Sequence, residues 1–238
     1  MNVSQALQQR KTVRAFTNKS VDPALIKSIL QRASRAPSNG NIQPWKIYAV
    51  TGSTLEQIKQ EAVSRHESGL PPDEKQEAVS RHESGLPPDE PEYTVYPMPL
   101  PAEYNERRKA IGEDLYNLLG VTREDKAGRQ RQFAENGRMF GAPVALFAYV
   151  DRQLSLGQWM DLGMFLQSVM LLCEEEGLAS CAQGYWSFFH TIVNKATNAP
   201  DELMLACGLA IGYEDKEAKI NSLVATRLPV DGFTTFLD

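Results

Sequence analysis

The sequence contains few of the residues that build metal centres and disulfide frameworks. Of its 238 residues, three are cysteine and three are histidine. The cysteines, Cys173, Cys181 and Cys207, lie in apolar surroundings without metal-ligand spacing, so we expect buried free thiols and no metal site. Such cysteine usage is typical of a reducing, cytoplasmic environment.

Long apolar runs are also missing. Residues 1–10 hold no apolar core of a secretory signal, and no stretch approaches the ~20 apolar residues that a membrane span requires. The net charge of −5 is mildly acidic, which argues against nucleic acid or an anionic membrane as the main partner. We therefore expect a soluble globular protein without nucleic-acid or membrane partners.

Two glycine-rich phosphate-binding patterns are absent as well. No G-x-G-x-x-G follows a predicted strand, and there is no G-x-x-x-x-G-K-[ST]. A tightly bound dinucleotide in a doubly wound sheet is therefore not expected. The length suits one domain over 1–238 with an ample core.

A tandem duplication interrupts this domain, because residues 59–74 and 75–90 both read KQEAVSRHESGLPPDE. Two copies are too few for a solenoid. The first copy continues a helix that we expect to begin after an N-cap at Ser53 and to end at Gly69. The second copy is either another short helix or a surface insertion, which loop-closure entropy tolerates.

The hydrophobic pattern predicts an α+β protein. Apolar residues at helical spacing over 156–176 predict a long central helix, and continuous apolar runs at 144–150 and 203–211 predict buried strands. Helices and strands do not alternate strictly, which favours an antiparallel or mixed sheet. Further predictions are a strand at 46–50, an extended tail at 227–238, and helices at 2–9, 22–34 (capped by Ser20 or Asp22), 104–119 and 123–140.

A dense run of small polar groups lies between two prolines at 36–45, which reads APSNGNIQPW. The prolines fix their own φ angles, and Gly40 permits a positive φ. Such a loop can aim Ser38, Asn39 and Asn41 at a flat polar heterocycle. An ordinary Asn-rich turn from helix to strand is the alternative interpretation.

A second pattern places Arg10, Thr12 and Arg14 at alternate positions. In an extended segment these side chains point the same way. Two guanidinium groups and a hydroxyl on one face make a receptor for a phosphate monoester. A solvated basic patch is the alternative.

Two shorter patterns complete the set. Gln183 and Gly184 follow a strand-like segment, and a glycine leaves its N–H accessible to a closely approaching group. The alternative is a plain turn into the next helix. Arg227 lies in an R-x-P near the C-terminus and, taken alone, is a surface charge.

In this order, the R-x-T-x-R, the P-S-N-x-N-x-Q-P-W, the Q-G and the late R-x-P resemble the FMN-dependent nitroreductase family, within it the nitrobenzoate- and nitroaromatic-reducing branch. The resemblance covers nearly the whole chain apart from the duplication. It implies a nitroreductase-like fold, with a central mostly antiparallel sheet flanked by helices, in an intertwined homodimer. FMN would lie at the subunit interface.

The resemblance also implies which residues hold the FMN phosphate and ribityl chain: Arg10, Thr12 and Arg14, with Arg227 completing the phosphate site. Some family members carry a basic residue two positions before the late arginine. Here that position is Ala225. We therefore expect fewer cations at the phosphate and a larger role for Arg14.

For the isoalloxazine ring, the resemblance implies contacts from a loop of the partner subunit, made by Pro37, Ser38, Asn39 and Asn41. Gln183 and Gly184 would lie against the ring, with the Gly184 N–H near flavin N5. The amide expected at the pyrimidine edge is that of Asn136, with Gln132 as the alternative.

The implied reaction is ping-pong, and no side chain is assigned as a catalytic acid. NADPH or NADH would reduce the flavin and leave before a small nitroaromatic or quinone substrate is reduced in two-electron steps. Alternatives are enone reduction, dehalogenation or dehydrogenation on the same fold, a non-catalytic flavin-binding protein, and a colourless assembly module using residues 104–140.

Because the duplication falls where pocket walls vary, we hypothesise that it alters substrate access.

Overall fold

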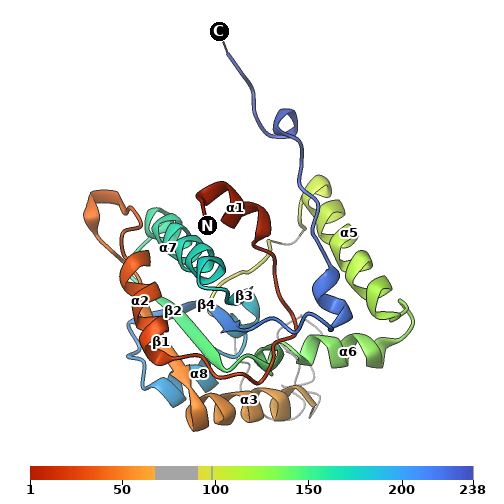
Figure 1. Cartoon of the computed structure of the whole chain (residues 1–238), viewed down its shortest axis with the longest axis horizontal. Coiled ribbons are helices and arrows are strands. Elements are labelled where there is room, and N and C mark those ends of the chain that lie inside the picture. Colours follow the sequence, from red (N-terminus) through yellow and green to blue (C-terminus); the bar gives the residue numbers. More distant parts are fainter. Residues whose placement is uncertain (68–90, 98, 238) are drawn as a thin grey trace.

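An antiparallel sheet forms the centre of the protein, a computed structural model of which describes residues 1–67, 91–97 and 99–237 (Figure 1). Within these residues the strand order is β1-β2-β4-β3, so β1 and β3 are the two edges. The predicted α+β class with an antiparallel sheet is confirmed. The strands are β1 (Lys46–Thr51), β2 (Val144–Asp151), β3 (Ala179–Gln183) and β4 (Leu203–Gly212).

Helices flank both faces of this sheet (Figure 1). In the described part of the chain, none is long and apolar enough to cross a membrane. The α-helices are α1 (Val3–Gln9), α2 (Pro23–Ala33), α3 (Gly52–Glu67), α5 (Ala102–Leu119), α6 (Lys126–Ala134), α7 (Leu156–Glu175) and α8 (His190–Thr197). Short 3-10 turns are η1 (Asn39–Asn41), η2 (Met139–Gly141), η3 (Gly184–Ser187), η4 (Lys219–Ser222) and η5 (Val230–Gly232).

The helix predicted over 123–140 is wrong at both ends. It is confined to α6, because the Asp125 side chain caps the Gly128 N–H at its start. Beyond its end, Met139 and Phe140 have φ values of 53° and 54°, which a right-handed helix excludes.

Helix boundaries elsewhere agree more closely with the predictions. Asp22, and not Ser20, caps α2 through the Ala24 N–H. Helix α3 begins at Gly52, one residue before the predicted cap Ser53, which is within the usual variation of helix ends. The predicted stop at Gly69 and both expectations for the second copy of the repeat lie outside the described residues.

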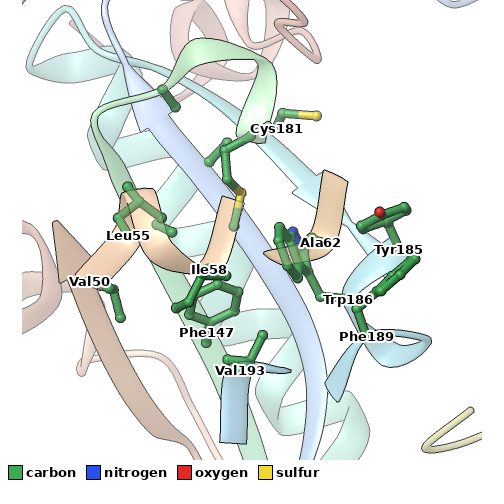
Figure 2. Packing of buried hydrophobic residues seen from close by; sticks show 14 of the residues in the cluster. Val50, Leu55, Ile58, Ala62, Phe147, Cys181, Tyr185, Trp186, Phe189 and Val193 are labelled. Atoms are coloured by element: carbon green, nitrogen blue, oxygen red, sulfur yellow. The ribbon is translucent and has the colours of Figure 1, made fainter. Parts of the chain in front are cut away.

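Strand β2 is buried on both faces, because alternate side chains enter two separate cores. One core lies under α3, α8 and η3 and receives Phe147 (Figure 2) and also Tyr149. The other lies under α2 and α7 and receives Leu146 and Val150. This double burial explains the continuous apolar run from which the strand was predicted.

The turn after β3 is fixed to the sheet by Trp186, which is fully buried in the first core (Figure 2). Its indole lies where Gly208 of β4 has no side chain, since a Cβ at Gly208 would come within 2.2 Å of Trp186 Cδ1. The Trp186 indole N–H donates to Gln183 Oε1 at 3.3 Å. Gly208 thus allows the Gln183–Gly184 turn to lie close to the sheet.

Replacing Gly208→Ala should destabilise the protein by about 1–3 kcal/mol, because the added methyl group displaces the Trp186 ring from a filled core. Urea unfolding measures the change. Gly112→Ala on α5 is the matched control, since a Cβ there meets nothing within 4 Å. It should be neutral or stabilising by about 0.5–1 kcal/mol. Equal unfolding midpoints for Gly208→Ala and the wild type would contradict this packing.

Candidate functional site

The segment after α1 runs along the outer edge of β3. Thr12 pairs with Ser180 as a parallel bridge, and the Val13 N–H donates to the Ser180 carbonyl at 3.1 Å. Val13 is buried in the first core, whereas Arg10, Thr12 and Arg14 are half-buried. The segment is therefore extended as predicted, and Val13 faces inward between two residues of the basic pattern.

Asn221 of η4 holds this segment in place. Its side-chain oxygen accepts the Arg14 N–H at 2.8 Å, and its amide donates to the carbonyls of Ala15 and Asp215, both at 2.8 Å. Only 2% of Asn221 is exposed. A buried amide with all these bonds made fixes the backbone on which Arg14 is carried.

Acidic side chains lie near two of the basic residues of this segment, Arg10 and Lys11. Lys11 pairs with Glu214 at 2.8 Å and is thereby neutralised. Burial raises the pKa of Glu174, against the effect of the neighbouring Arg10 charge.

Burial likewise raises the pKa of Cys181 to about 12, with Arg14 acting in the opposite direction. Cys181 thus stays a neutral thiol and is no nucleophile at neutral pH.

Strand β3 ends in the Gln183–Gly184 pair, and here the structure brings together two predicted residues far apart in the sequence. The Gln183 side chain is buried. Its amide group donates to the backbone carbonyl of Asn136 at 2.9 Å and to Asn136 Oδ1 at 3.2 Å. Its own oxygen accepts from Trp186. The alternative residue, Gln132, lies half-buried on α6. Gln183 therefore holds the half-buried Asn136 at the end of β3.

The proline-bracketed loop adopts a conformation that favours glycine and asparagine. Gly40, Asn41 and Gln43 have φ values of 59°, 57° and 53°. The Gln43 N–H donates to Ser38 Oγ at 3.0 Å. The side chains of Pro37, Asn39 and Asn41 are exposed, and Ser38 is half-buried. The loop thus presents its amides outward.

Helix α7 fixes the loop at both ends. At its start, the Asn39 N–H donates to Asp161 Oδ1 at 3.1 Å. At its end, the Trp45 ring stacks on Phe165, with centroids 4.8 Å apart. Asp161 is only 3% exposed, and its Oδ2 has no hydrogen-bond partner among the described residues. Asp161 and Phe165, one helical turn apart on α7, therefore stabilise the loop in a conformation with positive φ angles, which is costly for residues other than glycine.

Sequence reasoning missed Asp161 and Asn221. The sequence does hold a signal for Asp161, since it is the acidic residue among the buried, mainly apolar positions of α7. The sequence gives no signal for Asn221, because two of its three side-chain hydrogen bonds are to the backbone of Arg14 and Ala15, some 200 residues away.

The predicted residues do not all meet in one chain. The loop leads into β1 and the Gln183–Gly184 turn ends β3, which are opposite edges of the sheet. Three strand spacings, about 14 Å, separate those edges. Arg227 is exposed on a tail that runs beside α5 and then projects outward (Figure 1). Its guanidinium donates to the carbonyls of Ala225 and Thr226 in that same tail.

A metal centre is not part of this arrangement. Across the described ranges, no group of three or more histidine, cysteine or acidic side chains is placed to hold a metal ion.

Comparison with known proteins places the chain in a family. Residues 7–213 match the model of the Nitroreductase family, and the protein belongs to that family. A chloronitrobenzene nitroreductase of Comamonas testosteroni is 32% identical over 99% of this chain and 96% of its own length. A 4-nitrobenzoate reductase of Pseudomonas putida is 32% identical over 96% of this chain and 92% of its own length.

Solved structures share the fold. The FMN and NADPH-dependent nitroreductase NfnB of sphigopyxis sp. strain HMH has a TM-score of 0.88 at 40% identity, with full coverage of both chains. NfnB of Mycobacterium smegmatis, solved in complex with NADPH, has a TM-score of 0.84 at 26% identity, again with full coverage. The predicted resemblance and the nitroreductase-like fold are thereby confirmed.

Proposed function

We propose that this protein is an FMN-dependent oxidoreductase that uses NADPH to reduce small nitroaromatic compounds. One observation carries the proposal: the Arg10–Arg14 segment is held along the same edge strand, β3, that ends at Gln183 and Gly184. The names of the full-length relatives support the same chemistry.

The residues present fit this cofactor. Two guanidinium groups and a hydroxyl lie on a segment whose backbone bonds are satisfied by Ser180 and Asn221, which suits a phosphate. Ser180 and Gly184 are four residues apart, or about 13 Å of extended chain. FMN is longer than this from its phosphate to the far side of its ring, so one FMN molecule can reach from the Arg10–Arg14 segment beside Ser180 to the turn at Gly184.

Each group then has a separate task. Arg10, Thr12 and Arg14 would bind the phosphate and ribityl chain, and the Gly184 backbone would lie against the ring. Asn136 would offer its amide to the pyrimidine edge and Gln183 would hold it there, because the Gln183 side chain is already bonded within the chain. Bound FMN would supply the two-electron chemistry: hydride from NADPH would reduce it, and two electrons with two protons would then convert the nitro group to a nitroso group and water.

The separation of the loop from β3 supports a homodimer in which each subunit supplies its loop to the other. Helix α7, which contacts the loop through Asp161 and Phe165, also exposes Leu156, Met160 and Met164 at four-residue intervals, with exposed fractions of 82%, 68% and 40%. Ile42 of the loop is 51% exposed. An apolar stripe on one helix face is typical of a two-fold interface, which would bring the loop of one subunit to β3 of the other.

In this dimer Pro37, Ser38, Asn39 and Asn41 would reach the flavin ring of the partner. Asp161 would set their position through its bond to the Asn39 N–H. Arg227 would reach a phosphate only if the projecting tail of one subunit lies over the other.

Replacing Arg14→Gln should weaken FMN binding about 10- to 100-fold, because a charge-assisted bond to the phosphate is lost. Riboflavin, which lacks the phosphate, should bind wild type and variant equally. Fluorescence titration of both flavins measures the effect, with the exposed Arg123→Gln as the control. An equal loss for both flavins would contradict phosphate binding by Arg14.

Placing a charge in the α7 stripe with Met160→Glu should produce monomers with weakened FMN binding, because a carboxylate would be buried at the interface. Light scattering after size-exclusion chromatography measures the mass. Thr54→Glu adds the same charge at an exposed position of α3, which covers the other face of the sheet, and should leave the dimer intact. A Met160→Glu variant that remains dimeric would exclude this interface.

The reaction itself is tested with the FMN-loaded protein, NADPH and either nitrobenzene or 4-nitrobenzoate. We expect nitro-dependent NADPH oxidation, with parallel lines in double-reciprocal plots because one pocket serves both reactants in turn. NADPH oxidation that does not depend on the nitro compound would contradict the proposed activity.

A further inference from the structure

Residues 91–97 lie against the turn that follows β3. The Glu92 N–H donates to the Ser187 carbonyl, the last residue of η3, at 3.0 Å. At the first residue of η3, a Cβ on Gly184 would lie 3.6 Å from Val95 Cγ1. This segment therefore contacts both ends of the turn, and Val95 is the side chain that faces Gly184.

A buried carboxylate anchors the segment. The Glu92 side chain is 2% exposed, and its two oxygens lie 2.8 Å from Arg152 Nη2 and 3.2 Å from His190 Nδ1. Burial acts to raise the pKa of Glu92, but His190 and Arg152 outweigh it and the pKa is lowered. Arg152 in turn donates to the Asp201 carbonyl at 2.7 Å. Glu92 is thus a charged group held by elements on two sides.

Tyr93 adds a second attachment. Its hydroxyl donates to the Ala206 carbonyl of β4 at 2.6 Å, and its ring meets Trp159 of α7 edge-on, with centroids 4.8 Å apart. Burial raises the pKa of Tyr93 to about 12, so the phenol stays a donor at neutral pH. Thr94 and Tyr96, in contrast, are exposed. Two consecutive anchored residues fix the position of Val95.

We propose that Val95 is a specificity-determining residue that limits the size of the aromatic substrate, and that Glu92 is the positioning residue that holds it. The inference rests on the proposed function, in which Gly184 lies against the flavin ring. Val95 would present two methyl groups beside that ring, a surface suited to the apolar edge of a flat nitroarene and too close for a second fused ring.

The test compares Val95→Ala and Val95→Phe, each loaded with FMN, on nitrobenzene and 1-nitronaphthalene. Changing a pocket wall by a few carbon atoms alters discrimination by about tenfold or more. We expect Val95→Ala to raise, and Val95→Phe to lower, the ratio of kcat/KM for the naphthalene over the benzene substrate. Binding of the unreactive acids benzoate and 2-naphthoate, measured by calorimetry, should change in the same order.

Glu92→Gln should shift the ratio toward that of Val95→Ala, mainly through KM, because the freed segment no longer holds Val95 in place. Glu92→Asp retains the charge and should restore part of the wild-type ratio. Thr94→Ala, on the same segment but exposed, is the control and should behave as wild type.

The inference is overturned if both Val95 variants keep the wild-type ratio of kcat/KM and the wild-type order of acid binding. This result is separate from failure of the proposed function, which wild-type protein reveals by itself when NADPH does not reduce its flavin. Unchanged ratios in a wild-type-like nitroreductase would reject only the role of Val95.

Discussion

The site depends on how the outer edge of β3 is covered. An edge strand presents unpaired N–H and C=O groups, and here the segment around Thr12 and Val13 pairs with the strand at Ser180. Because that segment also carries Arg10 and Arg14, the pairing at Ser180 places these basic residues beside the strand. The same strand then delivers Gln183 and Gly184 at its end. Strand β3 therefore positions both the proposed phosphate site, along its edge, and the proposed ring site, at its end.

Buried polar residues keep the flexible parts of the site in place. Asn221 holds the backbone at Arg14, Asp161 holds the loop at Asn39, and Gln183 holds Asn136. Each is at most 3% exposed, so each is costly to bury unless bonded. This cost is compatible with a stable protein because two large apolar cores, one on each face of the sheet, surround β2 and β4. Rigid packing thus supports a loop with three positive φ angles.

The sequence alone was sufficient for the strands, the central helix and the alternation around Thr12, because apolar runs and local periodicity depend on nearby residues. It was insufficient where distant contacts decide. The positive φ angles at Met139 and Phe140 exclude these residues from the predicted helix, and Asn221 and Asp161 act on backbone groups far along the chain. The separation of the loop from β3 follows from strand order, which periodicity does not contain.

The proposed flavin site can be tested by the visible absorption spectrum of the purified protein, reconstituted with FMN and then given NADPH without oxygen. We predict protein-bound flavin bands that bleach on addition of NADPH, and much weaker retention of FMN by Arg14→Gln. Failure of the wild-type protein to retain FMN after reconstitution would contradict the claim that the segment along β3 and the Gln183–Gly184 turn form one flavin site. Retained flavin that NADPH does not bleach would contradict the proposed reductase activity.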